Sequence, residues 1–127
     1  MTKCNAHATM FDNNIIMGYD MCFRNSVGQI MLSKSSFLIS TATVLEDEFI
    51  VLLESIKTAI SYRVHILLFE TDCKSLVDTL TSSIVSIDEF DNLVFQCRSL
   101  LSSNPNYVML YLLKEYMTCH MCDDIAN

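Results

Sequence analysis

Three short runs of strand-forming residues at the start of the chain, separated by turn-forming residues, constrain its fold more than any other feature. β-branched, aromatic and sulfur-containing side chains fill residues 3–11, 15–25 and 28–40. An Asn-Asn pair at 13–14 separates the first two runs, and Asn-Ser-Val-Gly at 25–28 precedes the third. Such short polar breaks join antiparallel neighbours. The sequence therefore predicts three consecutive antiparallel strands.

A long amphipathic helix is predicted next. Thr43 and Glu46 have the spacing of a capping box, in which the threonine hydroxyl accepts from a free helix amide and the glutamate reaches back to the cap. Apolar residues then recur at helical spacing as far as the expected end near Tyr62, namely Leu45, Phe49, Leu52, Leu53, Ile56 and Ile60. We expect the opposite side of this helix to carry Asp47, Glu54, Lys57, Thr58 and Ser61.

Glu48 departs from the pattern of this helix. It precedes Leu52 by one turn, so it lies on the apolar side. A lone carboxylate there costs several kcal/mol unless it is paired or binds a metal. The alternative is a helix-start carboxylate that the helix dipole favours. We take Glu48 as the first candidate for a site.

The second half of the chain alternates strand and helix patterns. Residues 64–69 would place apolar side chains on both faces of a strand, which predicts a strand covered on both sides. We expect His65 within it to be a hydrogen-bonded core residue. A short helix with Leu76, Val77 and Leu80 follows. A second capping box at 86–89 precedes another helix, whose apolar positions are Phe90, Leu93, Val94, Cys97 and Leu101. After Pro105 we expect a strand over 107–113 and a terminal helix over 118–126.

The predicted fold class is α/β, with a five-stranded mixed sheet in the order β-β-β-α-β-α-α-β-α and helices packed on its faces. A length of 127 residues suits one domain, which we expect to span residues 1–127. Nothing in the chain has the composition of a linker between domains.

Composition and charge narrow the functional classes. Hydrophobic residues make up 51% of the chain and charged residues 18%, which is typical of a globular protein. The longest apolar stretches, 49–53 and 108–113, fall short of the roughly 20 residues that a membrane span needs. No apolar core follows Lys3, so we expect no signal peptide, an intracellular location and free thiols at the six cysteines. We expect the chain to be a monomer. Its net charge of -7 opposes tight binding to the phosphate backbone of a nucleic acid.

Five segments, in order, carry a resemblance to a known family. They are Lys3-Cys4-Asn5-Ala6-His7-Ala8, Gly18 through Arg24-Asn25-Ser26-Val27-Gly28, Glu46-Asp47-Glu48 with Leu53-Glu54, Phe69-Glu70-Thr71-Asp72-Cys73-Lys74-Ser75-Leu76-Val77, and Cys122-Asp123-Asp124-Ile125-Ala126. Over nearly its whole length the chain resembles the ribonuclease H-like family, most closely the small plant domains related to the ribonuclease H of retroelement reverse transcriptases.

The resemblance implies a nuclease with an acidic metal site. The family carries acids in the first strand, early in the first helix, at the end of the fourth strand and in the terminal helix. Glu48, Asp72 and Asp123 match the last three positions, with His120 or Asp124 as possible substitutes for Asp123. The implied cofactor is Mg²⁺ or Mn²⁺, the partner is an RNA-DNA hybrid, and the reaction is hydrolysis of the RNA strand. On its own, Asp72 would be interpreted as a helix N-cap and Asp123 as a solvated residue.

The first acidic position departs from the family pattern, because His7 follows Asn5-Ala6 where the family has aspartate. A neutral imidazole offers a metal one lone pair and no negative charge, whereas a carboxylate can bridge two ions. We therefore expect weakened hydrolysis, with a softer ion such as manganese or zinc still able to bind His7. The alternative is a catalytically inactive descendant that keeps the fold and weak nucleic-acid binding.

A third hypothesis is a zinc-holding interaction module. Cys4 with His7 and Cys119 with Cys122 both have the two-residue spacing of zinc ligands. Residues three apart in a strand point to opposite faces, however, which argues against a shared ion at Cys4 and His7.

Overall fold

The chain begins with the predicted antiparallel meander. The computed structural model describes residues 1–13, 15–40, 43–82 and 89–112. Strand β1 (Thr2–Phe11) pairs with β2 (Ile16–Arg24), and β2 pairs with β3 (Ile30–Ile39). Asp12 and Asn13 leave β1 with φ angles of 50° and 55°, the left-handed region that short polar side chains tolerate. This conformation reverses the chain into β2.

Helix α1 (Val44–Ser61) begins and ends where the sequence predicts. The Thr43 hydroxyl accepts a hydrogen bond from the Glu46 amide at 3.2 Å, which confirms the N-cap. At the other end, the amides of Tyr62, Arg63 and Val64 each donate to a carbonyl of the last turns at 3.0 Å. Arg63 adopts a φ of 57°, and this left-handed residue turns the chain out of the helix.

The strand predicted over 64–69 is shifted along the chain. Strand β4 is Leu67–Thr71, because the Val64 amide bonds to Ala59 at the end of α1 and pairing with β1 begins only at Leu67. His65 consequently lies before the strand with an exposed side chain. The prediction that His65 is a core residue is wrong.

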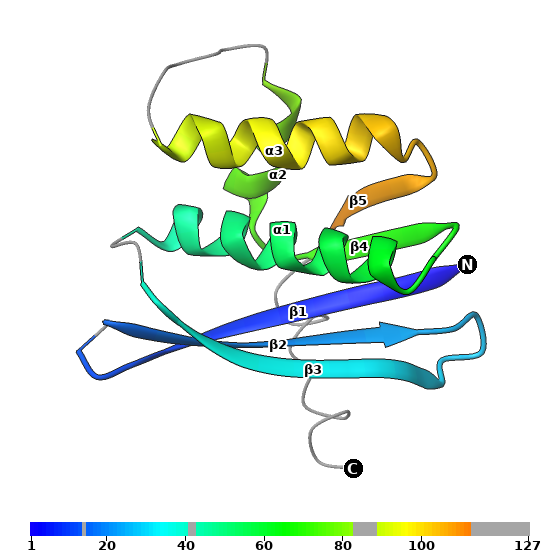
Figure 1. The fold of residues 1–127 in the computed structure, drawn as a ribbon, viewed down its shortest axis with the longest axis horizontal. Coiled ribbons are helices and arrows are strands. Elements are labelled where there is room, and N and C mark those ends of the chain that lie inside the picture. The colour runs from blue at the N-terminus through cyan, green and yellow to red at the C-terminus, as the bar shows by residue number, and fades with distance from the viewer. Residues whose placement is uncertain (14, 41–42, 83–88, 113–127) are drawn as a thin grey trace.

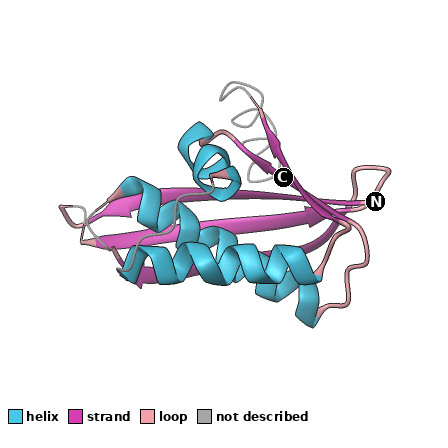
Figure 2. Cartoon of the chain, turned by 90° about the horizontal axis from the view of Figure 1, so that it is seen from above, coloured by secondary structure: helices cyan, strands magenta, loops and turns pink. Residues whose placement is uncertain are grey.

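The remaining elements complete a five-stranded mixed sheet. Strand β4 lies parallel to β1, and β5 (Tyr107–Tyr111) lies parallel to β4, which gives the order β3-β2-β1-β4-β5. Helices α2 (Lys74–Thr81) and α3 (Glu89–Ser103) form the crossover from β4 to β5. In Figure 1, α1 lies between the meander and α3, and Figure 2 shows the helical layer over the strands. The predicted fold class is confirmed. The terminal helix predicted over 118–126 and the capping residues 86–88 lie outside the described residues.

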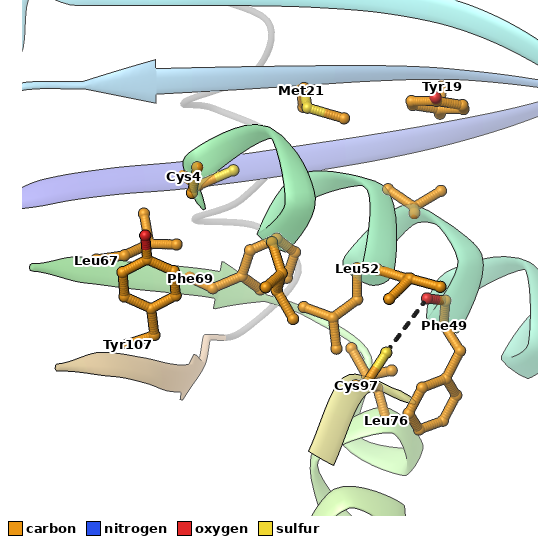
Figure 3. Packing of buried hydrophobic residues seen from close by; sticks show 14 of the residues in the cluster. Cys4, Tyr19, Met21, Phe49, Leu52, Leu67, Phe69, Leu76, Cys97 and Tyr107 are labelled. Atoms are coloured by element: carbon orange, nitrogen blue, oxygen red, sulfur yellow. Dashed lines mark hydrogen bonds between the residues drawn. The ribbon is translucent and has the colours of Figure 1, made fainter. Parts of the chain in front are cut away.

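The core fills the space between α1, the sheet and the crossover helices. Phe49, Leu52 and Ile56 of α1 are at most 1% exposed, as their spacing predicts. They belong to one buried cluster that includes Phe69 from β4 and Leu76 from α2 (Figure 3). The thiol of Cys97 on α3 donates to the carbonyl of Phe49 at 3.8 Å, which links the two helices. Each fully buried side chain of this size contributes about 1.5–3 kcal/mol.

Two residues assigned to the solvent side of α1 are instead buried. Asp47 is 3% exposed and accepts a hydrogen bond from the Ser40 hydroxyl at 2.8 Å. Thr58 is 8% exposed and donates to the Glu54 carbonyl at 2.7 Å. Both positions are tolerated because the polar atom has a partner.

Within the described residues, no helix is long and apolar enough to cross a bilayer.

Candidate active site

Glu48 lies in the second turn of α1 and is half-buried. Its pKa is raised to about 7, first by burial and then by repulsion from the carboxylates of Asp72 and Asp47. The contribution from Asp72 shows that acids distant in sequence approach each other where α1 begins and β4 ends. Burial also explains why the helix dipole does not dominate at Glu48, since a dipole at a helix start would lower the pKa of a carboxyl.

Asp72 directly follows β4, in the turn that leads to α2. The Thr71 hydroxyl accepts from the Cys73 amide at 3.0 Å, which fixes this turn. The N-cap of α2 is Cys73, which makes no side-chain cap bond. The structure therefore does not support the interpretation of Asp72 as an N-cap.

Cys73 belongs to the same corner, although the sequence singled it out only as part of a family motif. Its pKa is raised, mainly by burial and in part by the charges of Glu48 and Asp72, while the amides of Leu76 and Ser75 partly offset the rise. The corner is therefore rich in negative charge.

A buried polar contact lies beside this corner, between β1 and β4. Asn5 is 1% exposed and Glu70 is 7% exposed, and the Asn5 amide donates to Glu70 Oε1 at 3.3 Å. The two residues also form the last backbone pair of the β1–β4 ladder. His7 follows Asn5 by two residues on β1 and so continues the face that Asn5 occupies, whereas Asp72 lies in the turn after β4.

His7 itself is exposed on β1, opposite Asp20 of β2. The carboxylate of Asp20 accepts a hydrogen bond from the Ser35 hydroxyl on β3. Among the described residues, no three His, Cys, Asp or Glu side chains lie close enough to hold a metal ion. Of the four predicted ligands, the structure thus brings Glu48 and Asp72 together and places His7 outside that pair. Asp123 lies beyond the described residues, as do His120 and Asp124.

The structure argues against the N-terminal pair of predicted zinc ligands, Cys4 and His7. Cys4 is fully buried in the core, and its pKa is raised well above the ordinary value, mainly by burial. His7 lies on the opposite, exposed face of the same strand. These two side chains therefore cannot share an ion. Cys119 and Cys122 lie outside the described residues.

Comparison with known families identifies the chain. The sequence profile of the family described as "reverse transcriptase-like" matches residues 6–119. The chain belongs to this reverse transcriptase-like, ribonuclease H-like family. No protein of curated function matches the sequence of this ribonuclease H-like chain.

Solved structures agree with this family. The chain is similar to RNase H1 from the halophilic archaeon Halobacterium salinarum NRC-1, with 13% identity, a TM-score of 0.78, and coverage of 92% of this chain and 89% of that one. It is similar to LC11-RNase H1, isolated from compost and solved with an RNA/DNA hybrid, with 11% identity, a TM-score of 0.76, and coverage of 91% and 88%. A foamy viral protease-reverse transcriptase, also with an RNA/DNA hybrid, has 12% identity, a TM-score of 0.72, and coverage of 99% of this chain and 18% of that one. Identities this low show the fold, so the chemistry of this ribonuclease H-like chain has to be argued from its own residues.

Proposed function

We propose that this ribonuclease H-like chain hydrolyses the RNA strand of RNA-DNA hybrids with the help of divalent cations, and that His7 makes it slow. The observation that supports the proposal best is the approach of Glu48 and Asp72 in a half-buried corner. Two carboxylates in one half-buried corner repel each other, and this repulsion is the second cause of the raised pKa of Glu48. Such a pair persists when a proton or a cation compensates one of the charges.

The donor set fits a hard cation. Glu48 and Asp72 offer carboxylate oxygens, which Mg²⁺ and Mn²⁺ prefer, and we assign Asp123 as the third acid by family resemblance. When bound, such ions supply the positive charge that activates a water and stabilises the leaving oxygen in an in-line displacement at phosphorus. The residues themselves would have to hold the oxygens in place, and the bond from the Cys73 amide to the Thr71 hydroxyl orders the turn that carries Asp72.

The raised pKa of Glu48 makes cation binding at this residue depend on pH. With a pKa of about 7, this carboxyl is about half protonated at neutral pH when no cation is present. A cation therefore competes with a proton for Glu48, and its apparent affinity should rise with pH through this range. Glu48 is thus the residue that links occupation of the site to pH.

His7 is the reason for expecting a low rate. It stands at the position of the family's first acid, where an imidazole adds no negative charge, so the site attracts a divalent cation less strongly than a site with a fourth acid. Nitrogen ligands suit Mn²⁺ better than Mg²⁺, so we expect faster cleavage in Mn²⁺. His7 also favours the second candidate function, a non-catalytic domain that still binds hybrids weakly.

A cleavage assay on a labelled RNA-DNA hybrid tests the proposal. We expect slow cleavage by the natural chain in Mg²⁺, at least a tenfold increase in His7→Asp, and loss of cleavage in Asp72→Asn. Asp78→Asn, an exposed acid on α2, is the matched control and should leave the rate unchanged. Fast cleavage by the natural chain that survives Asp72→Asn would refute the site. Hybrid binding without cleavage, even in His7→Asp, would instead support the second candidate.

A further inference from the structure

Strand β3 ends the sheet with an unusually apolar edge. It is ten residues long, and among the described residues it pairs with β2 on one side and with no strand on the other. Its only charged residue is Lys34, and it contains no proline. Phe37 and Ile39 are 69% and 80% exposed. Natural sheets usually blunt such an edge with charges, proline or a cover, because unpaired backbone groups attract another strand.

The direction of the free backbone groups follows from the pairing. The Ser40 amide donates to the Ile15 carbonyl at 2.7 Å, so the backbone of Ser40 points toward β2. Backbone groups alternate along an antiparallel strand, so those of Ser33, Ser35 and Phe37 point away from β2. The open edge therefore offers an alternating row of donors and acceptors along the middle of β3.

A groove runs beside this edge, between β3 and α1. It has a volume of about 430 Å³ and is lined by Leu32, Ser33, Lys34, Glu54, Lys57, Thr58, Ser61 and Tyr62. The groove exists because α1 packs over β1 and β2 rather than over β3. The side chains of Lys34 and Lys57 are both exposed. Two lysines against one acid make this lining locally positive on a chain whose net charge is -7.

An apolar pocket continues the groove at one end. It has a volume of about 120 Å³ and shares Leu32, Thr58 and Tyr62 with the groove, while Phe23, Met31, Ala59 and Val64 complete its wall. Residues 32 and 34 of β3 are two positions apart, so the pocket and the lysines lie one side-chain repeat apart, roughly 6.8 Å.

We propose that the free edge of β3 docks an extended segment of a partner protein as a sixth strand. Backbone bonds to Ser33 and Ser35 would supply the general attraction, as in other cases of strand addition. An acidic side chain of the segment lies between Lys34 and Lys57. An apolar side chain two residues away enters the pocket beside Tyr62, and the alternate side chains contact exposed Phe37 on the other face.

A second copy of this chain fits the edge less well. Pairing β3 with another β3 would bring two copies of Lys34 close together, and β3 contains no acid to meet either one. The two chains would also each carry a net charge of -7. A nucleic acid would use the lysines but neither the apolar pocket nor the strand edge, and two lysines neutralise few phosphates.

Selection from a phage-displayed library of random dodecapeptides on the full chain tests the proposal. We expect enriched peptides to carry an acid two positions from a large apolar residue. Their fluorescein-labelled synthetic forms should bind at least tenfold more weakly to the Lys34→Glu/Lys57→Glu double variant. Lys3→Glu, an exposed lysine on the central strand β1, is the matched control and should bind normally.

Ser35→Pro provides an independent variant. Its amide points to the open edge, so proline removes a backbone donor to the peptide and no backbone bond to β2. Ser35→Ala is the matched control, because it loses only the hydroxyl bond to Asp20 on β2, and it should bind the peptide normally. For Ser35→Pro we expect at least a tenfold loss of peptide affinity with an unchanged circular dichroism spectrum. Four results would overturn the proposal: no enrichment, equal affinity for the lysine variant, a dimer whose β3 amides are protected from exchange, or lysine variants that weaken hybrid binding alone. None of these depends on whether the chain cleaves hybrids.

Discussion

Asp47 and Glu48 are neighbours on α1, yet their surroundings are opposite. Asp47 is 3% exposed and accepts a hydrogen bond from Ser40, so its burial ties the end of β3 to the start of the helix. Glu48 is half-buried and faces the charge of Asp72, which together with burial raises its pKa to about 7. A buried acid that has a donor stabilises the fold, whereas a buried acid that faces another acid lowers stability until a proton or cation compensates it.

The largest test of this contrast is the pH dependence of stability. The ordinary pKa of Glu48 is 4.5 and its folded value is about 7, so between these pH values the folded chain holds a proton that the unfolded chain has lost. This group's contribution to the free energy of unfolding is therefore fully present below pH 4.5 and is lost, by on the order of 3 kcal/mol, as the pH rises to about 7. Glu48→Gln should match the natural chain at pH 4.5 and exceed it by that amount at pH 8, in urea titrations with EDTA.

Glu54→Gln is the matched control for this experiment, since it changes the same residue type on the same helix. We expect it to shift stability by at most about 0.5 kcal/mol at either pH. An equal pH dependence in Glu48→Gln and the natural chain would mean that neither burial nor Asp72 raises the pKa of Glu48 in solution.

The opposite sign is expected for Asp47. Asp47→Ala removes the acceptor of the Ser40 hydroxyl at a buried position, which should lower the free energy of unfolding by about 2 kcal/mol. Urea denaturation at pH 8 measures the loss, with Asp78→Ala on α2 as the exposed control. A stabilising Asp47→Ala would break the distinction between the two acids.

A divalent cation should stabilise the chain through Glu48 and Asp72, and Asp47 should not be needed for this effect. At ten times its dissociation constant, Mg²⁺ should stabilise the natural chain at pH 8 by about 1.4 kcal/mol, and EDTA should reverse the gain. Asp47→Ala should keep this increment, while Asp72→Asn should lose it. Thermal unfolding followed by circular dichroism gives both values, and an undiminished increment in Asp72→Asn would remove Asp72 from the site.

The sequence predicted what local chemistry determines. Thr43 and Glu46 lie three residues apart, so their capping contact could be predicted from spacing, and the same is true of the apolar face that includes Phe49 and Leu52. The start of β4 was misplaced because the Val64 amide is used by the end of α1, which an apolar pattern does not reveal.

The candidate site was less predictable because it depends on distant contacts. The apolar side of α1 singled out Glu48, but Asp72 was chosen by family resemblance. The bond between Asn5 and Glu70 joins residues 65 positions apart, and the burial of Asp47 depends on Ser40 in the preceding strand connection. Strand and helix propensities carry no information about such pairs, which exist only once the sheet has assembled.

The smallest expected effect comes from Thr43, whose hydroxyl accepts from the Glu46 amide at the start of α1. Thr43→Ala should lower the free energy of unfolding by about 1 kcal/mol, and Thr43→Ser, which keeps the hydroxyl, should change it by a few tenths at most. The cap acts on the first turn, whereas Glu48 lies in the second turn on a helix held by the buried Phe49 and Leu52, so loss of the cap should leave the contrast between the two acids intact. The Mg²⁺ increment measured by thermal unfolding should therefore be the same in both variants. A Thr43→Ala variant could instead abolish the Mg²⁺ increment while lowering the free energy of unfolding by only about 1 kcal/mol. That result would show that the cap, and not the packing of α1 on the core, positions Glu48.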